Sequence, residues 1–155
     1  MRRKDKEIAS HDEISEILLS NNMCRLAYSD RNVPYITVMS YGYSDNCLFF
    51  HCAKEGRKLD IIAENNNVCF EITDSIKQIS AEKACDFSVS FRTLIGYGKI
   101  EQITGVMEKK QALDILMRHH SPEKNWEYSD KMVDAVNILV LKIDSITGKK
   151  NRISL

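Results

Sequence analysis

The segment HCAKEGRKLDIIAENN, residues 51–66, passes from the end of a predicted β-strand into a predicted amphipathic helix. The strand, CLFFHCA at 47–53, is rich in aromatic residues. Gly56, Arg57 and Lys58 lie at the start of the helix, where cations oppose the helix dipole and backbone N–H groups have no helical partner. Both features become favourable if an anion binds there, because the dipole attracts it and the two cations neutralise it. The segment therefore predicts an anion site at a strand-to-helix junction, with a solvated pair of cations as the simpler interpretation.

Strand-like runs dominate the rest of the chain. The predicted strands are MCRLAYS (23–29), YITVMSYGY (35–43), CLFFHCA (47–53), VCFEIT (68–73), FSVSFRTLIGYGKIEQIT (87–104) and NILVLKIDSIT (137–147). The predicted helices follow a capping box at Ser10, the glycine at Gly56, and residue 105. The turn SDN joins the second and third runs into a hairpin, and the fifth run should bend at Gly96 or Gly98.

These patterns predict a mainly β (α+β) fold, a small antiparallel β-barrel with peripheral helices. The short connections between the early strands favour antiparallel pairing. A sheet of this size has to close or cover its edges, which favours a barrel. No linker or internal repeat interrupts the pattern, so we expect one domain spanning residues 1–155.

The composition argues against several classes of function. Lys and Arg together number 22, as do Asp and Glu, so the net charge is zero and long-range attraction to nucleic acid or to an anionic membrane is not expected. No apolar run approaches the ~20 residues of a membrane span, and no apolar segment follows the basic start, so we expect a cytoplasmic protein. The five Cys contain no C-x-x-C pair and predict buried thiols rather than a metal site. The sequence also lacks a phosphate-binding loop and a G-x-S-x-G elbow.

His51 closes the third predicted strand. Alternation places its side chain on the face of Cys47 and Phe49, opposite to Leu48 and Phe50. A histidine at a strand end is most often a structural hydrogen-bond donor. Here the imidazole has a second interpretation, in which it points toward the anion or toward the reactive edge of a bound ring.

Four segments resemble the nitroimidazole-resistance branch of the pyridoxamine 5′-phosphate oxidase-like flavin-binding proteins. In chain order they are MRRKDKEI, RLAYSDRNVPYITVMSYGY, LFFHCAKEGRKLDIIAENNNVCFEI and FRTLIGYGKIEQI. The resemblance covers nearly the whole chain, and its most specific piece is H-x-A-x-x-G-R-K-L-D at residues 51–60. It implies a split β-barrel that forms a homodimer, with FMN bound between the subunits. The chain departs from the family pattern at Val38, where a proline is common, and this affects the expected backbone shape beside the ring.

The resemblance also implies a set of site residues. Arg57 and Lys58 hold the phosphate, the ring lies against residues 37–40, and His51 lies beside the flavin as the catalytic candidate. No metal is implied. The residues implied to contact the cofactor are Thr37, Val38, Met39, Ser40, His51, Gly56, Arg57, Lys58, Arg92 and Thr93.

Two classes of function stay open. FMN carries out hydride or one-electron transfer while the protein supplies binding and orientation, which suits a sequence without a catalytic triad. The first class is an FMN-dependent oxidoreductase of a small molecule, with NADH or NADPH as reductant and a nitroimidazole, reduced to an amine, as the implied substrate. The second is a non-catalytic flavin carrier or redox sensor, and a relative that binds haem instead is a further alternative. Trp126, in a polar stretch, either covers the flavin, anchors the dimer or simply packs.

Overall fold

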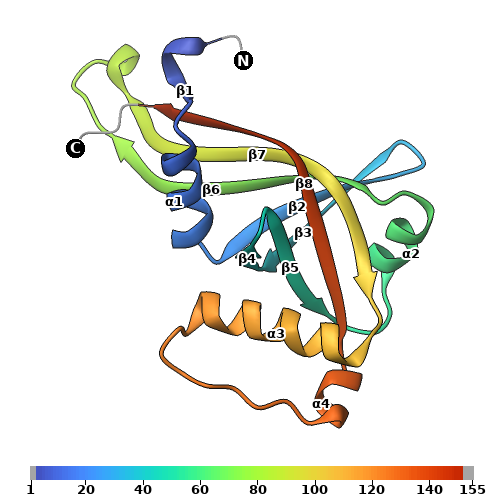
Figure 1. Ribbon diagram of the computed structural model, residues 1–155. Coiled ribbons are helices and arrows are strands. Elements are labelled where there is room, and N and C mark those ends of the chain that lie inside the picture. The colour runs from blue at the N-terminus through green and yellow to red at the C-terminus, as the bar shows by residue number, and fades with distance from the viewer. Residues whose placement is uncertain (1–2, 152–155) are drawn as a thin grey trace.

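The computed structural model describes residues 3–151, which form one curved antiparallel sheet with helices at its periphery (Figure 1). The strands are β1 (Glu7–Ile8), β2 (Met23–Asp30), β3 (Val33–Ser40), β4 (Gly42–Ser44), β5 (Cys47–Cys52), β6 (Asn67–Ile79), β7 (Ser88–Ile103) and β8 (Asn137–Asn151). The helices are α1 (His11–Ser20), α2 (Arg57–Glu64), α3 (Val106–His120) and α4 (Asp130–Asp134), with the short 3-10 helices η1 (Lys4–Lys6) and η2 (Ala84–Asp86). The predicted mainly β, antiparallel class is confirmed. The single-domain prediction also covers residues 1–2 and 152–155, which lie outside the described residues.

The sheet is split rather than closed. Its two end strands, β3 and β4, follow one another in the chain but do not pair with each other. The strand order is β3-β2-β6-β7-β8-β5-β4, and β1 pairs with β8. Tyr41 alone joins β3 to β4; its side chain is fully buried and its hydroxyl donates to the carbonyl oxygen of Leu18 at 2.8 Å. Its N–H donates to the carbonyl oxygen of Asn22 at 3.1 Å. The prediction of one strand over residues 35–43 was therefore wrong, since this anchored tyrosine divides the run and only β4 forms the hairpin with β5.

Two tight turns set the register of the β2–β3 and β4–β5 hairpins. Arg31 and Asn32 have φ angles of 48° and 71°, and Asp45 and Asn46 have φ angles of 49° and 59°. Positive φ at both central residues is typical of a type I′ turn, whose twist matches that of the paired strands. Asn and Asp tolerate this conformation better than most residues. The turn predicted at SDN is confirmed.

The long strand β7 bends against β8 at Gly98. The pairing register shifts between Tyr97 and Gly98, where Asp144 of β8 is left without an opposite residue. A Cβ atom on Gly98 would overlap the carbonyl oxygen of Lys142, so only glycine allows this close approach. The bend predicted at Gly96 or Gly98 is confirmed.

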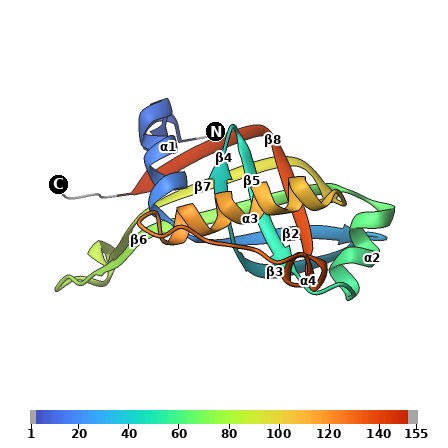
Figure 2. The ribbon, with the colours of Figure 1, turned by 60° about the horizontal axis from the view of Figure 1, so that its bottom comes forward.

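Helix α3 covers β4 and β5 (Figure 2). The three predicted helices are present, and the buried face of β5 carries Leu48 and Phe50 as alternation predicts. On α2, Ile61 is buried whereas Ala63 is exposed, because the helix turns the side of Ile61 toward β2. Among residues 3–151, no helix is long and apolar enough to span a membrane.

Candidate functional site

Gly56 sets the junction between β5 and α2. Its φ of 135° lies in a region that L-residues rarely adopt, whereas a Cβ atom added to it would meet no other atom within 4 Å, so the backbone angle rather than space requires glycine. The carbonyl oxygen of Gly56 accepts the N–H of Leu59 at 2.8 Å and starts the helix. By helix geometry, the N–H groups of Arg57 and Lys58 have no intrahelical acceptor. The start of α2 thus presents two backbone donors with two cationic side chains.

Arg57 is tied to the β2–β3 hairpin. Its Nη2 lies 3.2 Å from Oδ2 of Asp30, at the end of β2. Its guanidinium carbon lies 4.8 Å from the ring centroid of Tyr35 on β3, a cation–π contact. The Arg57 side chain is still 54% exposed, so it keeps free donors toward solvent. These contacts fix the position of the guanidinium between α2 and β3.

Lys58 differs from Arg57 in having no counter-ion. Its side chain is half-buried, and no carboxylate of the described residues lies within 4.0 Å of its Nζ. Its charge acts on Cys52: burial raises the pKa of that thiol, and the nearby lysine opposes the rise. A half-buried lysine without a carboxylate partner is uncommon, since removing an ammonium group from water carries a free-energy cost. The structure thus leaves one uncompensated positive charge at the start of α2.

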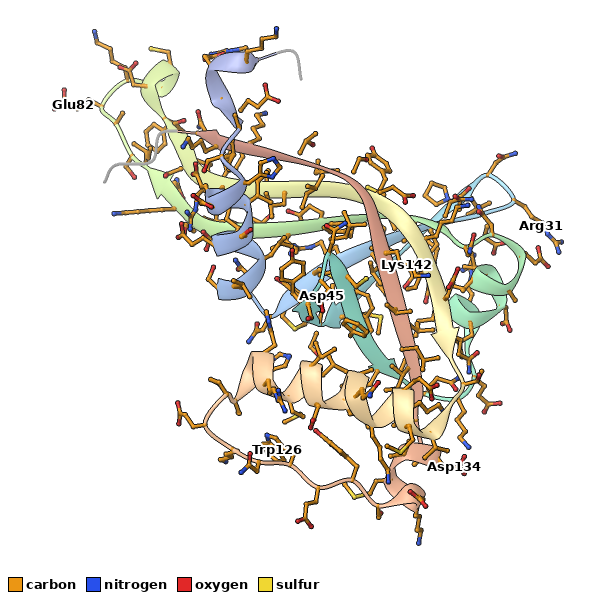
Figure 3. The ribbon with its side chains drawn as sticks, viewed as in Figure 1. Arg31, Asp45, Glu82, Trp126, Asp134 and Lys142 are labelled. Atoms are coloured by element: carbon orange, nitrogen blue, oxygen red, sulfur yellow. The ribbon has the colours of Figure 1, made fainter. Side chains whose placement is uncertain are left out.

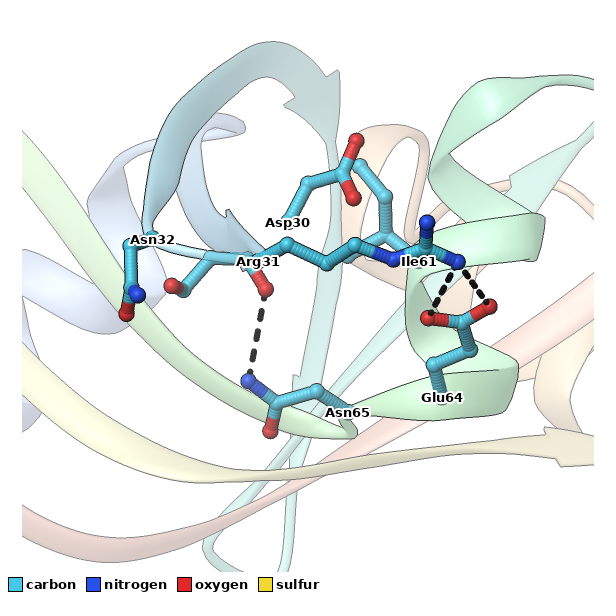
Figure 4. A pocket seen from close by; sticks show the side chains of 7 residues that line it. Asp30, Arg31, Asn32, Ile61, Glu64 and Asn65 are labelled. Carbon is cyan, nitrogen blue, oxygen red and sulfur yellow. Dashed lines mark hydrogen bonds and ion pairs between the residues drawn. The ribbon is translucent and has the colours of Figure 1, made fainter.

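Shallow depressions flank this junction on the side of the β2–β3 turn. One of about 280 Å³ is lined by Asp30, Arg31, Arg57, Asp60, Ile61 and Glu64. A neighbouring one of about 270 Å³ extends it to Asn65 (Figure 4). Across it Arg31 pairs with Glu64 at 3.2 Å, and the Asn65 amide donates to the carbonyl oxygen of Ser29 at 3.4 Å. The surface beside Arg57 is therefore polar and open.

Strand β3 presents an unpaired backbone edge. In a two-residue hairpin the residues that flank the turn form a hydrogen-bonded pair, and such pairs recur at every second position. Counting from the Asp30–Val33 pair, the N–H and C=O groups of Ile36, Val38 and Ser40 point away from β2. Because β3 ends the strand order, no strand of the described chain accepts them. This edge offers backbone donors and acceptors to a ligand.

The side chains of the predicted segment 37–40 have separate environments. The Thr37 hydroxyl lies 3.2 Å from the hydroxyl of Tyr28, and burial raises the pKa of Tyr28 to about 12. Met39 is buried in the core, whereas Val38 is 61% exposed on the opposite side of the strand. The backbone edge of β3, with the Ser40 side chain at its end, is therefore more accessible than the Thr37 and Met39 side chains.

His51 lies near the other end of β3. Gly42 of β4 pairs with Phe49, so the same register continued would place Ser40 opposite His51. β3 leaves this register to pair with β2, yet it remains in contact with β5. The imidazole is exposed, and its charge contributes to lowering the pKa of His120 after the larger effects of burial and of His119. The structure thus exposes His51 near the end of β5, a strand that β3 contacts; its predicted place beside the ring stays a prediction.

Arg92 and Thr93 point to opposite faces of β7. Arg92 is 16% exposed; its Nε donates to Asp74 at 2.7 Å and its Nη2 lies 3.1 Å from Glu16 of α1. Thr93 donates its hydroxyl to Glu71 at 2.9 Å. Both side chains already bind carboxylates within the described chain. None of these contacts brings Arg92 or Thr93 to Arg57. Their predicted contact with the cofactor stays a prediction.

Trp126 lies in the loop between α3 and α4, and α3 lies between this loop and the sheet (Figure 3). Its ring is 38% exposed and lies 5.5 Å from Nζ of Lys124.

Residues 3–151 contain no group of three His, Cys, Asp or Glu side chains arranged to hold a metal ion.

The outer face of the sheet, on the side away from the core, is a second feature. Directly opposed residues of antiparallel strands share a face, so the pairs Val38–Arg25, Arg25–Glu71 and Glu71–Ile95 place these four on one side. Glu71 accepts hydrogen bonds from Arg25 at 2.9 Å and from Thr93 at 2.9 Å. The large apolar residues exposed on this face are Met23, Ile36, Val38, Ile95 and Tyr97. An exposed apolar area of this kind is typical of an interaction surface.

Sequence reasoning missed Asp30 and Tyr35, which hold Arg57. It also missed the hydrogen bonds that Glu71 accepts on the outer face. Asp30 precedes a turn and Tyr35 follows it, so each has an adequate local explanation in the sequence. Only the strand register, which sets the hairpin beside α2, reveals their contact with Arg57.

Comparisons with known proteins bear on the family and the fold. The family model of pyridoxamine 5′-phosphate oxidase matches residues 10–150. A structure from Bacteroides thetaiotaomicron, provisionally described as a 5-nitroimidazole antibiotic resistance protein, is 32% identical, with 93% of this chain and 86% of that chain covered and a TM-score of 0.83. An FAD and haem binding protein from Mycobacterium smegmatis is 20% identical, with 96% and 74% covered and a TM-score of 0.86. A flavocytochrome from Azotobacter vinelandii is 18% identical, with 99% and 72% covered and a TM-score of 0.85. The last two show a shared fold. No curated protein matches the chain.

Proposed function

The chain belongs to the pyridoxamine 5′-phosphate oxidase family, and on this premise we propose that it is an FMN-dependent oxidoreductase of a small molecule. The split-barrel type that the resemblance implies is confirmed. The observation that carries the proposal is the uncompensated, half-buried Lys58 at the start of α2, beside two free backbone N–H groups.

The phosphate of FMN suits this junction on three grounds. The N–H groups of Arg57 and Lys58 would donate to its oxygens, and the positive end of the helix dipole favours its charge. Lys58 gains the counter-ion that it lacks. Arg57, still about half exposed, keeps donors for the phosphate while Asp30 and Tyr35 hold it in place. Gly56 lets the backbone turn at the point of contact.

The ring of FMN suits the open edge of β3. From Tyr35, which touches Arg57, to Ser40, near His51, the strand rises about 17 Å. This length can underlie a flavin ring with an extended ribityl phosphate. Val38 and Ser40 would offer backbone hydrogen bonds to the polar edge of the ring, and Thr37 and Met39 would support the strand from the core side.

Bound FMN supplies hydride or single-electron transfer. The chain's own residues would bind the cofactor and orient it toward the substrate. We propose that His51, which is exposed at the end of β5, would donate a proton to the substrate atom that is being reduced. Nitro compounds of the nitroimidazole type are the substrates that we propose, with NADH or NADPH as the reductant. The support for this substrate class is the 32% identity to the Bacteroides protein.

We propose that two copies of the chain form a homodimer through the outer face, with a flavin at the subunit interface. Exposed Ile36, Val38, Ile95 and Tyr97 would lose contact with water, which favours association. The Glu71 carboxylate already accepts hydrogen bonds from Arg25, Thr73 and Thr93, so its burial would cost less than that of an unpaired charge. The five cysteines are free thiols, which suits a reducing cytoplasm, where we place the protein.

The first test is the absorption spectrum of the purified protein, with mass measurement of any released cofactor. Flavin absorption with the mass of FMN supports the proposal, and a colourless protein that does not take up added FMN refutes it. Anaerobic mixing with NADH or NADPH then separates the enzyme from a flavin carrier, because only an enzyme that uses these donors is bleached rapidly.

A haem-binding relative is the second candidate, since two proteins of similar fold are described as binding haem together with FAD or as a flavocytochrome. A Soret band in the same spectrum would select it.

The His51→Ala variant should retain FMN and lose turnover of a nitro substrate. If it retains full turnover, His51 has no catalytic role.

A further inference from the structure

Strands β6 and β7 continue beyond the barrel as a two-stranded arm, residues 76–90, with η2 at its tip (Figure 1). The arm begins at a β-bulge, where the register shifts between Asp74 and Lys77 and Ser75 has a φ of 59°. Bulges bend a strand pair and increase its twist. The arm therefore leaves the sheet in a direction set by its backbone.

One face of the arm is apolar and open. Ile76, Phe87 and Val89 are 69%, 49% and 41% exposed. They line a shallow depression of about 450 Å³ together with Gln78 and Ser88. Asn151, at the end of β8, donates to the Ser88 hydroxyl and to the carbonyl oxygen of Val89, but it leaves these apolar side chains exposed. An apolar cluster on the face of a two-stranded ribbon indicates a surface that is covered in the working protein.

This face is continuous with the outer face of the barrel. Strand β7 alternates regularly from Ser88 to Tyr97, so Val89, Phe91, Thr93, Ile95 and Tyr97 all point to one side. The opposite side of the same stretch is covered by α1, as the ion pair of Arg92 with Glu16 shows. A single strand thus carries an apolar row from the arm to the barrel.

The row has a nearly symmetrical composition. Phe87 and Val89 lie at one end, Ile95 and Tyr97 at the other, and Thr93, already bonded to Glu71, lies near the middle. A surface that carries similar apolar groups on both sides of its centre can cover itself when a second copy is rotated by 180°. This self-complementarity favours a second copy of the chain over an unrelated partner.

We infer that, in the homodimer of the proposed function on which this inference rests, the two arms pack on each other's barrels around a two-fold axis that passes β7 near residue 92. This axis places Val89 of one subunit against Ile95 of the other. It also places Phe87 against Tyr97. The arms act as clasps that extend the interface beyond the barrels.

A charge-pair exchange tests this register. Val89→Asp and Ile95→Lys, each alone, should raise the dissociation constant of the dimer at least about tenfold, measured by sedimentation equilibrium. The double variant should recover about tenfold relative to Val89→Asp alone. Within one subunit the two positions are about 20 Å apart along the strand, so recovery requires contact between subunits. The reversed pair, Val89→Lys with Ile95→Asp, repeats the test if a variant folds poorly by circular dichroism.

Val106→Asp is the matched control, because Val106 is 50% exposed in the first turn of α3, where an added carboxylate suits the helix dipole. Its dimer should dissociate as the wild type does. Single variants at positions 89 and 95 that dimerise as tightly as wild type would overturn the arm contact and leave the homodimer intact. Weakened dimers without recovery in either double variant would overturn the register. A monomeric wild type would overturn the homodimer as well, while the flavin spectrum would still report on cofactor binding.

Discussion

Replacing Lys58 with alanine tests the phosphate site most directly. Lys58 is half-buried and has no counter-ion among residues 3–151, so its charge would act on the phosphate with little competition. A charge-assisted hydrogen bond contributes about 1.5–3 kcal/mol, and limited solvent screening places Lys58 in the upper part of this range. We expect the dissociation constant of FMN to rise about 30- to 150-fold.

Quenching of flavin fluorescence at fixed ionic strength measures this change. Riboflavin, which lacks the phosphate, should bind the wild type and the Lys58→Ala variant equally. Lys54→Ala is the matched control, because Lys54 lies in the connection just before α2 but pairs with Asp134 at 3.3 Å. Its effect on FMN should be small. Equal losses in the two variants, or an equal loss for riboflavin, would refute a phosphate contact by Lys58.

Three further predictions concern the neighbouring ion pair and the stability of the fold. Asp30→Asn should tighten FMN binding about fivefold in the same fluorescence assay, because it frees the Arg57 guanidinium and removes a like charge near the phosphate, worth about 1 kcal/mol. Weaker binding would mean that Asp30 positions Arg57 more than it competes for it. Gly42→Ala should lower the free energy of unfolding by about 1–3 kcal/mol in urea titrations, because the added Cβ would lie 2.7 Å from Cα of Leu116. Burial raises the pKa of Tyr28 to about 12, against about 10 in the unfolded chain. The stabilisation that the protonated hydroxyl gives the folded state is therefore complete below pH 10 and is lost as the pH rises to 12. Tyr28→Phe should therefore flatten the decline of unfolding free energy across that window.

Strand and helix positions could be predicted because each depends on a local period. The alternation in residues 47–52 predicts the two faces of β5, and the turn at Asp45 and Asn46 follows from residues that tolerate positive φ. The division between β3 and β4 could not be predicted in this way. Tyr41 has the same strand propensity as its neighbours, and only the burial of its hydroxyl against Leu18 of α1 makes it a corner.

The site could be predicted in outline but not in its distribution of charge. Arg57 and Lys58 are equivalent in the sequence, two adjacent cations after a glycine. The structure distinguishes them because Asp30, 27 positions earlier, neutralises Arg57 and leaves Lys58 without a carboxylate among the described residues. Arg92 illustrates the same limit, since its two carboxylate partners come from α1 and from the bulge of β6.

The split in the barrel connects the proposed cofactor with the proposed dimer. An edge strand with free backbone groups and exposed Ile36 and Val38 promotes uncontrolled pairing with other chains. Closing the barrel would remove that hazard, but the anchor at Tyr41 directs β3 and β4 apart. Under the proposal, a flavin ring accepts the free hydrogen bonds of β3 while a second copy covers its apolar side chains. Flavin binding and dimerisation should then be mutually reinforcing. Because each chain carries one site, saturating FMN should tighten the dimer, measured by sedimentation equilibrium, by the square of the factor by which dimerisation tightens FMN binding at each site. A dimer whose dissociation constant is the same with and without FMN would break this link.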